Sequence, residues 1–267
     1  MRVTARWRSA PVVGGALEKS GLLPARPQPE RGPLPLKATD IKIIQSGWFS
    51  WALLDTRTGA LSGPDDRDVV STTASLIKPW IAADFLRRTA DRGLTPSEED
   101  LEQIESMIRD SDNEAADALY IEDGRDDSIR RLISTCGLVD SRVADDLGWS
   151  RTLISAADIT RLGACIADGR AAGPRWTSYL LDQMRAVTGT GDFGVRKAFP
   201  ADQQSKIAIK NGWVDRDEEQ EYHVSCLAIG DGWVVGVVTR YQIDKGYEYG
   251  ARICELVGQQ LRQAAGG

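Results

Sequence analysis

A serine and a lysine three positions apart are the residues of this chain best suited to chemistry. Ser75 and Lys78 open an apolar run with helical spacing, and residues i and i+3 share one face of a helix. A serine hydroxyl attacks a carbonyl group only when a base removes its proton, and a buried lysine can lose its charge and act as that base. The pair predicts an activated serine, although the same spacing also occurs in an ordinary capped first turn.

Two further polar motifs occur later in the chain. The triplet Ser111–Asn113 stands where one predicted helix ends and the next begins, and the triplet Lys210–Gly212 lies on the first strand predicted after the helices. Considered alone, Ser111 and Asn113 are good helix caps, the aspartate between them is structural, and Lys210 is an exposed strand lysine. The order of the three motifs, each in a suitable element, favours catalysis over these separate roles.

The hydrophobic pattern predicts an α/β (α+β) fold, in which an antiparallel sheet is flanked by helices and an all-α lobe is inserted. An aromatic segment at 47–55 followed by a turn indicates a strand and hairpin, and residues 75–190 are mainly helical in pattern. Alternating segments between 207 and 241 predict three antiparallel strands. The tail predicts an amphipathic helix.

These elements divide the chain into three parts. Five prolines with scattered charges between residues 21 and 39 indicate a flexible leader over 1–39. The predicted strands assign 40–70 and 203–267 to a sheet domain, and the predicted helices assign 71–202 to a mainly helical lobe. The candidate nucleophile stands near the start of that lobe.

The composition excludes several classes of partner. The chain has 267 residues, a formal charge of −6 and no basic cluster, so a nucleic acid or an anionic membrane surface is not an expected partner. No apolar stretch approaches the ~18 residues of a membrane span. We expect a small-molecule or peptide substrate and no cofactor, and the sequence does not determine the oligomeric state.

Histidine and cysteine usage limits the chemistry further. The single histidine, His223, argues against a Ser-His-Asp triad or a histidine-rich metal site. The cysteines Cys136, Cys165, Cys226 and Cys254 lack metal-ligand spacing, so we predict no metal; they are buried thiols, or form one or two disulfides if the protein is exported. The apolar N-terminal stretch is short and broken by Pro and Gly, which favours the cytoplasm and leaves an exported form open.

With the three motifs assembled, the sequence resembles the serine penicillin-recognising enzymes, which include class A β-lactamases and penicillin-binding proteins. Their motif set is S-x-x-K, S-D-N and K-[ST]-G, and residues 75–78, 111–113 and 210–212 follow it in order. The resemblance extends from the first predicted strand to the C-terminus. It implies a β-lactamase/transpeptidase-like fold and an acyl-enzyme mechanism.

The resemblance also implies a role for each motif residue. Ser75 would attack a carbonyl group while Lys78 removes its proton, and Ser111 would pass a proton to the leaving group. The backbone N–H groups of Ser75 and Trp213 would hold the oxyanion.

The implied substrate-binding residues are Asn113, Lys210, Asn211, Gly212 and Trp213. Asn113 would hold the catalytic lysine and a substrate amide, and Lys210 would attract a substrate carboxylate.

This chain departs from the class A pattern at three places. Ser111 follows Ser75 by only 36 residues, which predicts a trimmed helical lobe and a more open pocket. Asn211 replaces the usual Thr or Ser, which weakens the case for penicillin-like substrates. The loop 143–151 lacks the deacylating glutamate and offers only Asp145 and Asp146 as replacement bases. We therefore predict poor β-lactam turnover.

The sequence leaves more than one function open. The first is a serine acyl-enzyme hydrolase or acyltransferase acting on a small amide, ester or peptide, with weak or no β-lactam hydrolysis. The second is a catalytically silent binding or regulatory module that keeps the fold. A D,D-peptidase, a β-lactamase or a glutaminase are further alternatives.

Overall fold

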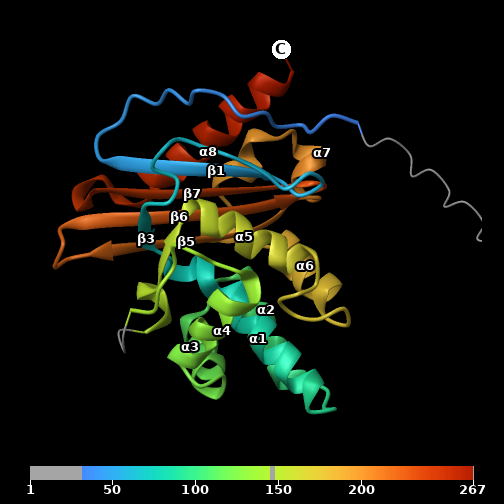
Figure 1. The fold of residues 1–267 in the computed structure, drawn as a ribbon. Helices are drawn as coiled ribbons and strands as arrows, with labels where there is room; N and C mark the ends of the chain where they lie inside the picture. Colours follow the sequence, from blue (N-terminus) through green and yellow to red (C-terminus); the bar gives the residue numbers. More distant parts are fainter. Residues whose placement is uncertain (1–31, 145–147, 267) are drawn as a thin grey trace, which may run out of the picture. The chain divides into compact units, whose positions relative to one another are not determined.

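Five strands form one antiparallel sheet in the computed structural model, which describes residues 32–144 and 148–266. From Leu34 onward the described chain is one compact unit. The strand order is β2-β1-β7-β6-β5 (Figure 1). The strands are β1 (Trp48–Asp55), β2 (Ala60–Ser62), β5 (Ala208–Arg216), β6 (Glu221–Gly230) and β7 (Trp233–Gln242).

Helices cover both faces of this sheet. Gly236 and Tyr241 lie five positions apart on β7, so they face opposite sides. A Cβ atom at Gly236 would lie 2.5 Å from the first backbone oxygen of α5 (Ala156–Ala167). On the other face, Tyr241 Oη accepts a 3.0 Å hydrogen bond from the backbone of α8 (Gly246–Ala265). The sheet is therefore packed between α5 and α8.

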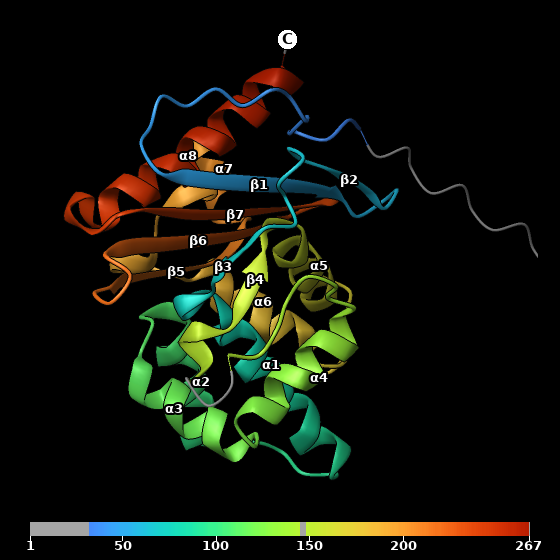
Figure 2. The ribbon, with the colours of Figure 1, turned by 60° about the vertical axis from the view of Figure 1, so that its left-hand side comes forward.

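The helical region between β3 (Val70–Thr72) and β5 is built around α1 (Lys78–Asp91), whose Trp80 and Ile81 are fully buried. In Figure 2 it lies on the β5 side of the sheet. Besides α5, its other α-helices are α2 (Glu98–Arg109), α3 (Asn113–Glu122), α4 (Asp126–Cys136), α6 (Thr177–Arg185) and α7 (Ala201–Gln204). A two-stranded sheet of β3 (Val70–Thr72) and β4 (Leu153–Ser155), absent from the sequence prediction, leads into α1 and α5.

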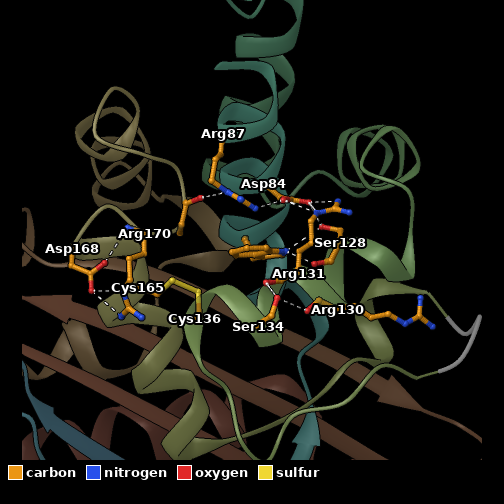
Figure 3. Close-up of a disulfide and its surroundings, with 12 residues drawn as sticks. Asp84, Arg87, Ser128, Arg130, Arg131, Ser134, Cys136, Cys165, Asp168 and Arg170 are labelled. Carbon is orange, nitrogen blue, oxygen red and sulfur yellow. Dashed lines mark hydrogen bonds and ion pairs between the residues drawn. A yellow bond between two sulfur atoms is a disulfide. The ribbon is translucent and has the colours of Figure 1, made fainter. Parts of the chain in front are cut away.

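A buried carboxylate joins α1 to α4. Asp84 is fully buried and accepts hydrogen bonds from Arg87, Ser128 and Arg131 (Figure 3). Trp80 Nε1 donates to Ser128 Oγ at 3.1 Å. Because a buried carboxylate is costly unless it is paired, this network fixes how α4 lies against α1, the helix that begins at Lys78.

All four cysteines form disulfides. Cys136–Cys165 joins α4 to α5 (Figure 3), and Cys226–Cys254 joins β6 to α8. Of the two states that the sequence left open, the structure has the oxidised one. In the described part of the chain, no helix has the length and apolar character to cross a membrane.

Candidate active site

Ser75 lies at a sharp turn between β3 and α1. It is the second residue of a 3₁₀ helix, Ala74–Ile77, and is half-buried. The residue before it, Ala74, has φ +44°, a left-handed conformation that costs a non-glycine residue energy. The turn is held by the Thr73 backbone N–H, which donates to Thr152 at 2.9 Å. The candidate nucleophile thus stands on a constrained turn rather than inside a regular helix.

The third motif lies directly against this turn. Gly212 on β5 has no room for a side chain: a Cβ atom there would lie 2.7 Å from the Ser75 backbone nitrogen and closer still to the Thr73 oxygen. β5 is one of the two edge strands of the sheet, and its backbone meets that of the 3₁₀ helix at Ser75. The sequence assigned Gly212 to substrate binding, and the structure places it where glycine is needed for this close approach.

Lys78 is completely buried and its ammonium is surrounded by acceptors. Its Nζ donates to the backbone oxygens of Ser111 at 2.6 Å and Asp112 at 3.0 Å, and to Asn113 Oδ1 at 2.7 Å. Burial lowers the pKa of Lys78 to about 7, against an opposing effect of the nearby Asp112 and Asp117 charges. A lysine with this pKa is partly neutral near pH 7 and can accept a proton. Among the described residues, no hydrogen bond joins its Nζ to the Ser75 hydroxyl.

The second motif combines helix capping with contacts to the lysine. The Asp112 carboxylate caps α3 by accepting from the backbone N–H groups of Glu114 and Ala115, which agrees with its predicted structural role. Ser111 has φ +64°, and its Oγ lies 3.4 Å from Lys78 Nζ. The left-handed turn at Ser111 directs both of its oxygens toward the lysine. The cap is Asp112, which leaves Ser111 and Asn113 available for the site.

Lys210 is a buried residue and not the exposed strand lysine of the structural alternative. It is 1% exposed, and its Nζ donates to the Ile108 backbone oxygen at 3.1 Å. Burial, and to a smaller extent the Lys78 charge, hold the pKa of Lys210 well below its usual value, while Asp110 opposes them. Lys210 therefore lies close enough to Lys78 for the Lys78 charge to act on it. Carboxylate binding by Lys210 stays a prediction.

The side chains of Asn211 and Trp213 both contact the segment 189–193. Both Asn211 Nδ2 hydrogen bonds go to backbone oxygens, of Gly191 at 3.0 Å and Phe193 at 2.9 Å. The Asn211 amide thus fastens the segment 189–193 to β5, and its predicted contact with substrate stays untested. The half-buried Trp213 ring packs edge-on against Phe193, with centroids 5.7 Å apart.

A comparison with protein families identifies the family to which this chain belongs. A family described as the Beta-lactamase enzyme family matches residues 101–264, which is more than half of the chain. The chain belongs to the beta-lactamase enzyme family. The match covers the second and third motifs, and its start at 101 leaves Ser75 and Lys78 outside the matched segment.

Curated relatives of this β-lactamase family member come from mycobacteria. A protein of Mycobacterium tuberculosis named "Putative lipoprotein LppW" is 29% identical over 213 residues, which cover 77% of this chain and 68% of the relative. The same name and identity apply to a protein of Mycobacterium bovis.

Solved structures confirm the predicted fold class. An "Ancestral (GNCA) Beta-lactamase class A" aligns with a TM-score of 0.62 and 21% identity, covering 82% of this chain and 95% of that one. The structure of "PBP-A" aligns with a TM-score of 0.65 and 18% identity, covering 84% of this chain and 92% of that one. A β-lactamase from Xanthomonas campestris pv. campestris aligns with a TM-score of 0.63 and 17% identity, covering 83% of this chain and 92% of that one. Together with the family match over residues 101–264, they confirm the recognition of a β-lactamase-related serine hydrolase family.

The sequence did not identify every residue at this β-lactamase-like site. The Trp149 ring lies 4.9 Å from Lys78 Nζ, and its Nε1 donates to Asp117 at 2.6 Å. Tyr247 of α8 contacts the Trp213 ring at 6.0 Å between centroids. No local pattern signals these contacts, because each joins segments distant in sequence. Asp145 and Asp146, the candidate replacement bases, lie outside the described residues.

Proposed function

We propose that this protein is a serine hydrolase or acyltransferase that forms an acyl-enzyme on Ser75, with Lys78 as the base. The observation that carries the proposal is the buried Lys78, whose pKa of about 7 suits proton transfer near neutral pH. The proposed substrate is a small amide, ester or peptide. Family membership supports a serine hydrolase type of function at this coarser level.

In the proposed acylation step, Ser75 Oγ bonds to the substrate carbonyl carbon and its proton passes to neutral Lys78. The negative charge on the carbonyl oxygen would be held by the backbone N–H groups of Ser75 and Trp213. A donor of this kind is typically worth about 3 to 4 kcal/mol in the transition state. Support comes from Gly212, whose close approach brings β5 against the Ser75 backbone nitrogen.

The collapse of the tetrahedral intermediate needs a proton for the leaving group. Ser111 Oγ is 3.4 Å from Lys78 Nζ, which supports a path from Lys78 through Ser111 to the departing nitrogen or oxygen. The bond between the carbonyl carbon and the leaving atom breaks, and Ser75 keeps the acyl group. Asn113 would orient Lys78 through its 2.7 Å hydrogen bond.

We also propose that the protein works in an oxidising compartment. Disulfides persist in secreted and periplasmic proteins and are rare in the cytosol, and this chain has two. The mycobacterial relative carries "lipoprotein" in its name, which is consistent with a place outside the cytoplasm. This proposal departs from the cytoplasmic location that the N-terminal sequence favours.

Hydrolysis of a p-nitrophenyl ester tests the proposed function. We expect Ser75→Ala to abolish hydrolysis and Ser134→Ala, a change at an exposed serine of α4, to leave the rate unchanged. Equal rates for Ser75→Ala and the unmodified protein would instead support the silent binding module. The feature of this chain that favours the binding module is Asn211. Its amide donates to two backbone oxygens, whereas the family has a hydroxyl group at this position.

A further inference from the structure

Trp149, which belongs to none of the three motifs, packs over Lys78, the proposed base. Its ring centroid is 4.9 Å from Lys78 Nζ, and the residue is 8% exposed. It begins a 3₁₀ helix, Trp149–Arg151, just before β4. An aromatic face attracts an ammonium group electrostatically, so the ring and the Ser111–Asn113 oxygens together enclose Lys78 Nζ.

Hydrogen bonds fix Trp149 at its backbone and at its ring. Its backbone oxygen accepts from Thr73 Oγ1 at 3.2 Å and from the Thr152 N–H at 3.1 Å. Its Nε1 donates to Asp117 Oδ1 on α3 at 2.6 Å. The backbone of Trp149 is therefore tied to Thr73 before Ser75, and its ring is tied to the helix that carries Asn113.

A tryptophan in this place cannot act as a base. Its indole has one polar hydrogen and no acceptor nitrogen, and Asp117 already takes that hydrogen. The two carboxylates whose charges act on Lys78 each accept hydrogen bonds through Oδ1, where Asp112 caps α3 and Asp117 accepts from the indole. The ring thus covers Lys78 with an apolar surface that cannot orient an attacking water.

The leaving-group side of Lys78 has the opposite character. There Ser111 presents its hydroxyl 3.4 Å from Nζ, and the proposed function assigns this hydroxyl the proton of the departing group. By microscopic reversibility, an incoming amine can use the same path in reverse and give its proton to Ser111 and Lys78. The Trp149 ring itself offers an attacking water no such path, because it has no acceptor for a proton.

We propose that Trp149, held by Asp117, is a positioning residue that shields the acyl-enzyme from water, so that a primary amine entering past Ser111 accepts the acyl group. This inference rests on the proposed acyl-enzyme function. In the transfer step the amine nitrogen bonds to the acyl carbon and the carbon–Oγ bond of Ser75 breaks. The amine proton passes through Ser111 and Lys78 to Ser75 Oγ, and an amide and the free serine result.

The test measures how the acyl group divides between water and an amine. The full chain is acylated with p-nitrophenyl acetate, the Ser75 adduct is followed by intact mass, and glycinamide is added as the acceptor. We expect Trp149→Ala to shorten the adduct lifetime in water at least about tenfold and to lower the ratio of amide to acid, with a smaller effect on acylation. Trp149→Phe, which keeps a ring and loses the Asp117 bond, should move both readouts in the same direction by less.

Two controls separate shielding from general damage. Trp176→Phe makes the same change at a half-buried tryptophan of another segment and should leave both readouts unchanged, and melting curves check that each variant folds. Unchanged lifetime and amide-to-acid ratio in Trp149→Ala and Trp149→Phe would overturn this inference while a Ser75 adduct upholds the acyl-enzyme. A chain that forms no Ser75 adduct would overturn the proposed function and this inference with it.

Discussion

Gly212 lies so close to Ser75 that a Cβ atom at position 212 would stand 2.7 Å from the Ser75 backbone nitrogen. Real Cβ atoms do not approach backbone so closely, so a side chain here would move β5 away from the nucleophile turn. The contact links an edge strand of the sheet to the 3₁₀ helix that carries the candidate nucleophile. It also explains physically why the third motif needs a glycine.

Gly212→Ala should therefore damage the site more than the fold. We expect the Ser75 acylation rate to fall about 10² to 10³-fold, the loss typical of a misplaced oxyanion donor, with a smaller loss of thermal stability. Gly266→Ala is the matched control, because a methyl group added at that position would have its nearest neighbouring atom 3.9 Å away. An acylation rate in Gly212→Ala within twofold of the unmodified protein would contradict the proposed geometry.

The acylation rate should depend on pH through Lys78. Because the free amine is the proposed base, the rate should rise with pH and level off, with a midpoint near the Lys78 pKa of about 7. Lys78→Arg should lower the rate about 10² to 10⁴-fold, since its guanidinium stays protonated. A rate that is flat between pH 5.5 and 8.5 would argue against Lys78 as the base.

His223 is the control for that midpoint. Burial lowers its pKa below the usual 6.5 against the opposing effect of Glu221, and its Nδ1 lies 2.8 Å from Thr72 Oγ1 on the strand before Ser75. We expect His223→Gln to keep the midpoint near pH 7, because the histidine contacts β3 and not the lysine. A midpoint that disappears in this variant would assign the titration to His223.

Asp123 should make stability depend on pH. Burial and the charge of Asp84 raise the pKa of Asp123 to about 7, although Arg88 and Arg131 oppose the shift. Its pKa in the unfolded chain is about 3.9, so the folded state holds a proton that the unfolded state has lost between these values. The free energy of unfolding therefore falls as pH rises from about 4 to 7.

Asp123→Asn removes this pH dependence of stability. The asparagine can still accept the hydrogen bond that Arg88 donates to Asp123 at 2.9 Å in the native protein. We expect Tm at pH 8 to rise by about 2 to 6 °C and its dependence on pH below 7 to weaken. Asp127→Asn, at an exposed position of α4, should change neither. A lower Tm at pH 8 for Asp123→Asn would show that the arginine pairing outweighs the burial cost.

The two disulfides should contribute measurably to stability. Replacing both Cys136 and Cys165 by serine should lower the free energy of unfolding by about 2 to 5 kcal/mol, because the link between α4 and α5 is lost. Urea denaturation measures the loss, and the same pair of changes at Cys226 and Cys254 tests the second link. Reaction of all four cysteines with iodoacetamide in urea without reductant would contradict both links.

Local signals explain which parts of the fold were predictable. Ser97 and Asp100 form a capping box at the start of α2, and Gly137 ends α4 in the left-handed conformation. Both signals lie within a few residues of the helix end that they determine. The strands β3 and β4 were missed, because three residues each are too short to show alternation.

The candidate site likewise has residues that the sequence could predict and contacts that it could not. Ser75, Lys78 and Ser111 belong to motifs with fixed spacing, so the sequence could propose them together. The Trp149 contact with Lys78 and the occupied amide of Asn211 depend on how distant segments pack. The burial of Lys210 could not be foreseen either, because an isolated lysine on a strand is usually exposed.

Covalent labelling tests the central claim most directly. The full chain is treated at pH 8 with a fluorophosphonate probe, and intact mass with peptide mapping locates the adduct. We predict a single adduct on Ser75 that is absent from Ser75→Ala and forms much more slowly in Lys78→Arg. An unlabelled Ser75, under conditions in which a known serine hydrolase is fully labelled, would contradict Ser75 as the nucleophile.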